Sequence, residues 1–111
     1  MEVTIVQHGK EVVQEVMEKV SEEVAKVKFN VKRANDPIDS LAYAKKGSEE
    51  SDYVMLFVEI PEDKDYLRNS FYNGLAFLEA TTGKTILKEI YTDLEEPDVD
   101  EVVKKFIESA F

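Results

Sequence analysis

The sequence predicts an α/β fold, in which helices cover both faces of a parallel β-sheet. Short β-branched or apolar runs alternate four times with longer amphipathic segments, and this alternation is typical of parallel sheets. One run, residues 53–60, is apolar almost throughout, as a strand buried on both faces would be. Two others, residues 28–33 and 84–91, mix apolar with polar side chains, which indicates edge strands.

These differences predict the order of the strands. Residues 53–60 and 2–7 are expected at the centre, with the two mixed runs at the edges, and the order 2-1-3-4 satisfies all four. The expected architecture is one three-layer α/β/α domain over residues 1–111, flavodoxin- or Rossmann-like. A ferredoxin-like βαββαβ fold with an extra C-terminal helix is the alternative, but it would leave residues 34–51 as a long loop.

The first two helices are predicted from apolar spacing and from capping residues. Residues 10–27 place valines three and four positions apart, the spacing of a helix that packs on one side. The second helix is expected between Asp36, placed as its N-cap, and Gly47, expected to end it. Pro37 would occupy the first helical position, where proline is well tolerated.

The other two helices are expected over residues 64–82 and at the end of the chain. The earlier one has leucine and phenylalanine at helical spacing, and Asp63 and Asp65 are expected to cap its start. The last helix follows Pro97 and has acidic residues in its first turn, where they complement the helix dipole.

Composition limits the classes of function. A formal net charge of -10 argues against binding to nucleic acid or to an anionic membrane surface. No stretch is long and apolar enough for a membrane span, and the first residues lack the pattern of a signal peptide. The absence of cysteine excludes disulfides, thiolate catalysis and zinc–sulfur sites. A soluble cytoplasmic protein is expected.

A candidate ligand site follows from the strand order. Ligands of open parallel sheets bind at the carboxyl ends of the strands where the order reverses, here between the first and third strands. The only histidine would serve there as a general base, and the amides after Gly9 would hold an anion, such as a nucleotide or sugar phosphate. The candidate ligand-binding residues are His8, Gly9, Lys10, Asp36, Glu59 and Asp63.

No cofactor or metal is predicted. Asp36, Glu59 and Asp63 carry oxygens that suit a hard divalent cation, but their spacing matches no metal-binding motif. Phosphate-binding loops are absent as well, since "QHGKE" has one glycine and "TTGKT" at 81–85 leads from a helix into a strand.

Residues 51–86 run through a strand, an acidic loop and a helix to a Gly-Lys pair and a further strand. This layout resembles part of the nucleoside deoxyribosyltransferases and of TIR-type domains. The resemblance implies a catalytic glutamate two to three helical turns before Gly83. The chain has Asn73, Gly74 and Leu75 there, so no catalytic residue is predicted.

The helix over residues 64–82 predicts an interface. It is apolar on nearly every side, whereas a peripheral helix of so small a domain has one sheet to pack against. The surplus apolar surface predicts a second copy of the chain or another protein as partner. The candidate interface residues are Tyr66, Tyr72, Ala76, Phe77 and Ala80.

Two classes of function remain open. The favoured one is a non-catalytic binding or regulatory module that self-associates or binds a protein through the 64–82 helix. The reason is that the chain has one histidine, no cysteine and no motif at catalytic spacing. The alternative is a small enzyme or binder of a nucleotide- or phosphate-bearing ligand at the carboxyl ends of the first and third strands. A pocket lined by His8 and Glu59 would favour the alternative, and an exposed patch of Tyr72 and Phe77 with no pocket would favour the module.

Overall fold

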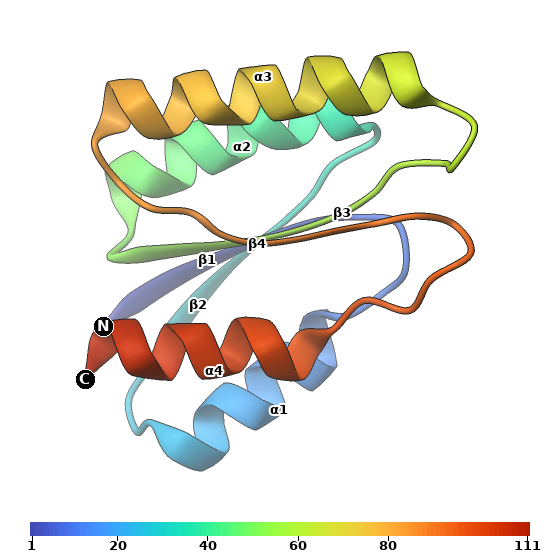
Figure 1. Ribbon diagram of the computed structural model, residues 1–111. Helices are drawn as coiled ribbons and strands as arrows, with labels where there is room; N and C mark the ends of the chain where they lie inside the picture. The colour runs from blue at the N-terminus through green and yellow to red at the C-terminus, as the bar shows by residue number, and fades with distance from the viewer.

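A parallel sheet lies between two pairs of helices in the computed structural model, which describes residues 1–111 (Figure 1). The strands are ordered β2-β1-β3-β4, and all neighbours are parallel. The predicted order 2-1-3-4 is therefore confirmed, and the ferredoxin-like alternative is wrong. The strands are β1 (Glu2–His8), β2 (Lys28–Arg33), β3 (Tyr53–Glu59) and β4 (Leu87–Tyr91).

Each face of the sheet carries one pair of helices (Figure 1). One pair is α1 (Val13–Glu23) and α4 (Val99–Ala110), and the other is α2 (Pro37–Glu50) and α3 (Asp65–Thr82). Side chains of a strand point alternately to the two faces. Ile5 and Phe57 accordingly join the apolar cluster under α1 and α4, while Val6 and Leu56 join the cluster under α2 and α3. The two central strands thus contribute apolar side chains to the cores beneath both pairs of helices.

The helix α1 is shorter than predicted, because it begins at Val13 and ends at Glu23. The buried side chain of Gln7 explains the late start. Its Oε1 accepts a hydrogen bond from the Val12 amide at 2.9 Å, so residues 9–12 form a separate loop. At the other end, Lys26 has a φ of 61°, where the chain turns into β2.

The helix α2 is capped as predicted but does not end at Gly47. The Asp36 carboxylate accepts a hydrogen bond from the Asp39 amide at 2.8 Å, and the helix continues to Glu50. Gly47 is buried, and an ideal Cβ there would lie 2.8 Å from Cγ2 of Thr4 in β1. Glycine at this position allows the helix to lie close to the strand.

The helix α3 begins at Asp65, and Lys64 stands at its N-cap without a side-chain capping bond. The prediction that Asp63 caps this helix is therefore wrong. Asp65 lies in the first turn and binds Arg68 at 2.8 Å. Gly83, with a φ of 68°, ends the helix in the left-handed conformation that glycine adopts without strain.

The last strand and helix also start later than predicted. β4 begins at Leu87 rather than at residue 84. The preceding residue, Ile86, is buried and packs under α2 and α3. Asp98 caps α4 by accepting a hydrogen bond from the Glu101 amide at 3.1 Å. No helix is both long enough and apolar enough to cross a membrane.

Two helical glycines provide a test of this packing. We expect Gly47→Ala to lower the free energy of unfolding by about 1–3 kcal/mol, because the new methyl group meets Thr4. Gly74→Ala is the control, since its methyl group would meet only Cδ1 of Leu41, the end of a flexible side chain. This control should leave the stability unchanged or raise it by up to about 1 kcal/mol. Urea denaturation measures both, and equal effects would contradict the close approach of α2 to β1.

Candidate functional site

His8 and Glu59 leave the same edge of the sheet on opposite faces. His8 shares its face with Val6, which packs under α2 and α3, and Glu59 shares its face with Phe57, under α1 and α4. The sheet therefore separates the only histidine from this carboxylate. The structure divides the predicted set of residues into two groups, one on each face.

On one face, His8 lies beside the start of α2. Its Nδ1 donates a hydrogen bond to the Ala34 carbonyl at 3.0 Å. The pKa of the Asp36 carboxyl is lowered, mainly by the hydrogen bond from the Asp39 amide and to a smaller extent by the charge of His8. The negative charge of Asp36 in turn raises the pKa of Asp39. The structure thus brings His8 and Asp36 together, with Asp36 already used as a helix cap.

On the other face, Gly9 lies directly on Glu59 and Tyr91. Gly9 has a φ of 115°, and an ideal Cβ there would lie 2.5 Å from Cβ of Glu59 and 2.8 Å from the Tyr91 hydroxyl oxygen. Tyr91 is 3% exposed, and its burial raises the pKa of the phenol, with the charge of Glu59 adding to the effect. Side chains of the protein itself therefore fill the expected crevice at the ends of β1 and β3.

Three of the backbone amides that follow Gly9 already have partners within the chain. The ammonium group of Lys10 is also bound, to the Glu96 carboxylate at 2.9 Å. An incoming phosphate would have to displace these interactions. The occupied amides are those of Lys10, to Tyr91 Oη at 2.9 Å, Val12, to Gln7 Oε1 at 2.9 Å, and Val13, to Glu11 Oε1 at 3.3 Å.

The carboxylates of the candidate site do not gather around a common point. No three histidine, aspartate or glutamate side chains lie close enough together to hold a metal ion. Asp36 caps α2, Glu59 packs against Gly9, and Asp63 is exposed in the loop before α3.

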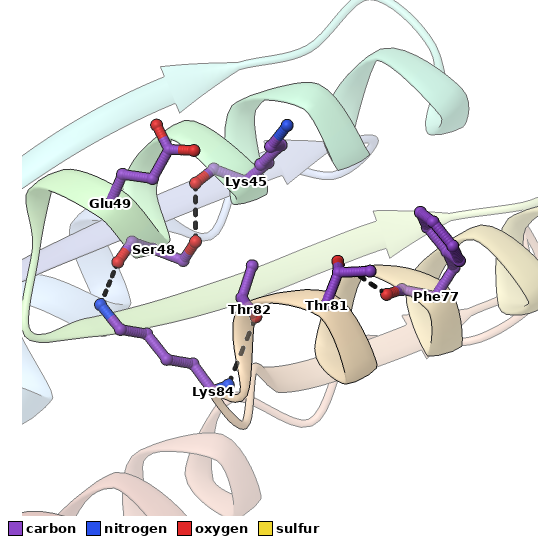
Figure 2. A pocket seen from close by; sticks show the side chains of 7 residues that line it. All are labelled: Lys45, Ser48, Glu49, Phe77, Thr81, Thr82 and Lys84. Atoms are coloured by element: carbon purple, nitrogen blue, oxygen red, sulfur yellow. Dashed lines mark hydrogen bonds between the residues drawn. The ribbon is translucent and has the colours of Figure 1, made fainter.

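The larger of two surface hollows lies between the carboxyl-terminal ends of α2 and α3 (Figure 2). Its volume is about 460 Å³. It forms where the ends of two helices pack together in the tertiary structure, and the sequence did not predict it. The ammonium group of Lys84 extends across it to the Ser48 carbonyl, so it caps α2 (Figure 2). The lining residues are Lys45, Ser48, Glu49, Phe77, Thr81, Thr82 and Lys84.

Most polar groups of this hollow are bound within the protein. The hydroxyls of Ser48, Thr81 and Thr82 donate to helix carbonyls at 2.6, 2.9 and 2.9 Å. Two helix carboxyl ends, each with a partial negative charge, also disfavour an anion here. The second hollow, about 280 Å³ between α1 and α4, has a charged rim with Asp100 and Lys104. Neither hollow includes His8 or Glu59.

Beyond its first residue, Asp65, the helix α3 has an outer surface without charge. From Tyr66 to Thr81 every exposed side chain is uncharged, and the two charged residues of this stretch, Arg68 and Glu79, are half-buried and form ion pairs with Asp65 and Lys88. The exposed side chains, here called the α3 face, are Tyr66, Asn69, Ser70, Tyr72, Asn73, Ala76, Phe77, Ala80 and Thr81.

The two outer layers of the domain differ in chemistry. On α1 and α4 every exposed side chain is polar or charged. On α3, by contrast, Tyr66 is 85% exposed, Phe77 71% and Tyr72 43%, and α2 adds the exposed Ile38 and Tyr43. In a chain in which 34% of the residues are charged, this uncharged aromatic surface is a specific feature of one layer.

Comparison of the sequence with protein-family models and with curated proteins finds no match. The filled edge of the sheet, the two hollows and the α3 face are therefore the features on which a proposal of function rests.

The packing of Tyr91 can be tested by removing its hydroxyl. Tyr91→Phe leaves the Lys10 amide without its partner, so we expect the free energy of unfolding at pH 7 to fall by about 1 kcal/mol. Because the folded state raises the pKa of Tyr91, its contribution is complete below about pH 10 and is lost as the pH rises further. The variant should therefore lose stability less steeply than the wild type above pH 10.

Tyr66→Phe is the matched control, because Tyr66 is 85% exposed and its hydroxyl makes no hydrogen bond within the chain. Urea denaturation at pH 7 and above pH 10 compares the three proteins. Identical curves for both variants would contradict the role of Tyr91 in closing this edge.

Proposed function

We propose that this chain is a non-catalytic binding or regulatory module that contacts another protein chain through the α3 face. The observation that carries the proposal is the uncharged aromatic surface on one layer of an otherwise charged domain. Exposed aromatic rings gain free energy when a partner removes them from water, about 25 cal/mol per Å² of apolar surface. Protein interfaces are enriched in such rings and depleted of charged side chains at their centre.

The edge of the sheet supports the same proposal. His8 and Glu59 face different layers, an arrangement that does not suit an acid–base pair acting on one small substrate. The alternative, a site for a nucleotide- or phosphate-bearing ligand at the carboxyl ends of β1 and β3, requires Tyr91 and Glu59 to move away from Gly9. The exposed Phe77 together with the filled crevice favours the module.

We propose a cytoplasmic setting for this module. The chain has no cysteine, which suits a reducing compartment. Its net charge of -10 disfavours nucleic acid and anionic lipid as partners, which leaves a protein surface as the expected contact.

Photo-crosslinking tests the proposed contact in the cells that make the protein. A benzophenone analogue of phenylalanine replaces Phe77, and the same analogue replaces Lys104 on α4 as the control. We expect illumination to produce a covalent adduct heavier than the monomer from position 77, and little or none from position 104. Equal yields from the two positions, or no adduct, would contradict a protein-binding role for the α3 face.

The ligand alternative is tested separately by amide NMR spectra of labelled protein with nucleotides, sugar phosphates and Mg²⁺. We expect no saturable shifts at residues 7–10 and 59–63, because Tyr91 and Gln7 already bind the Lys10 and Val12 amides beside this edge. Saturable shifts confined to these residues would overturn the module and make the ligand site the leading proposal.

A further inference from the structure

We infer that the partner of the α3 face is a second copy of the chain, with the two α3 helices packed antiparallel about a two-fold axis at Asn73. This inference rests on the proposed function, since it takes the α3 face to be a protein-binding surface. It adds the identity of the partner, the direction of the partner helix and the register of the contact.

The exposed positions of α3 repeat with the spacing of a helix that packs lengthwise on another helix. Tyr66, Asn73 and Ala80 recur every seven residues, and Asn69 and Ala76 lie between them at steps of three and four. All five are exposed on one side of the helix. This is the spacing found where two helices cross at about 20° and interlock along several turns.

The seam is self-complementary in shape when the helices run antiparallel. With Asn73 opposite the partner's Asn73, Tyr66 meets the partner's Ala80 and Phe77 meets the partner's Asn69. Each large ring thus faces a shorter side chain, which lets the helix axes approach closely. A parallel pair would instead set Tyr66 against Tyr66 at one end and Ala80 against Ala80 at the other, with crowding at the first and a gap at the second.

If two copies associate, charge selects the α3 face over the other surfaces as the place where they meet. Two chains that each carry a net charge of -10 repel one another, and the exposed surface of α1 would bring its own glutamates together. The α3 face has no exposed charge, so its contact with a second α3 face brings no like charges together directly and removes none from water. Antiparallel helices also place the positive end of one dipole beside the negative end of the other.

Single cysteines test the geometry, because the chain has none of its own. Packed helix axes lie about 8–10 Å apart, and Cα atoms lie about 2.3 Å from each axis, so facing Cα atoms come within disulfide range. We expect Asn73→Cys to form a disulfide-linked dimer rapidly under mild oxidation. Lys104→Cys, exposed on the charged helix α4, is the control and should remain largely monomeric.

The direction of packing is tested by mixing two variants. Tyr66→Cys and Ala80→Cys should form a mixed disulfide with each other much faster than either forms one with itself. Faster formation of the two self-linked dimers would show parallel packing and overturn the antiparallel arrangement.

Sedimentation equilibrium tests the same surface without cross-linking. The wild type should approach twice the mass of the 12.7 kDa chain, and Phe77→Glu should weaken dimerisation at least about tenfold. Ser21→Glu adds the same charge on the exposed surface of α1 and should change the dissociation constant far less. Equal effects of the two substitutions would overturn the inference.

The outcomes separate this inference from the proposed function. A wild-type protein that stays monomeric, with Asn73→Cys cross-linking no faster than Lys104→Cys, overturns the second copy as partner. If position 77 then still yields a photo-adduct with a mass other than twice the chain, the module keeps its support with a different partner. If position 77 yields none, both proposals fail.

Discussion

The parallel pairing of β1 with β3 is the interaction on which the rest of the structure depends. Both strands are buried on both faces, so their side chains supply two separate cores, one beneath each pair of helices. The same alternation determines the chemistry at the ends of the strands. It sends His8 towards α2 and Glu59 towards the β1–α1 loop, and a catalytic pair at this edge would need both on one face.

The carboxyl edge of the sheet is closed by side chains in the way that a ligand closes it in nucleotide-binding folds of similar topology. Gln7 and Tyr91 accept hydrogen bonds from the loop before α1, and Glu59 packs against Gly9. Since these groups bind the amides of Lys10 and Val12, an anion at either amide would first have to displace them.

The strand order and the existence of each helix were predictable because they depend on local patterns. The apolar run at 53–60 is itself the buried strand that it predicts. Asp36 and Pro37 likewise lie at the helix start that they predict. The end of α2 was not predictable in this way. Gly47 follows the local pattern of a helix stop, yet its role is set by Thr4, a residue from a distant strand.

The candidate site shows the same division between local and tertiary information. Topology alone placed His8 and Glu59 at one edge, but the face that each occupies depends on the register of β1 with β3, in which His8 pairs with Val58. The filling of the crevice depends on Tyr91, the last residue of β4, which is distant in sequence from Gly9. The apolar composition of α3 was visible in the sequence. That its rings face outwards is a tertiary fact, because only the packed sheet shows which side of the helix is already covered.

Under the proposed self-association, the contrast between the two helical layers would decide which surface is used. Repulsion between chains opposes contact through α1 and α4, where charged side chains cover the surface, and it acts against every orientation that brings these layers together. The α3 face carries no such charge, so local repulsion is weakest in the orientation that brings two α3 faces together. In the proposed dimer, the choice of surface would depend on like-charge repulsion between the other faces as much as on burial of the aromatic rings of the α3 face.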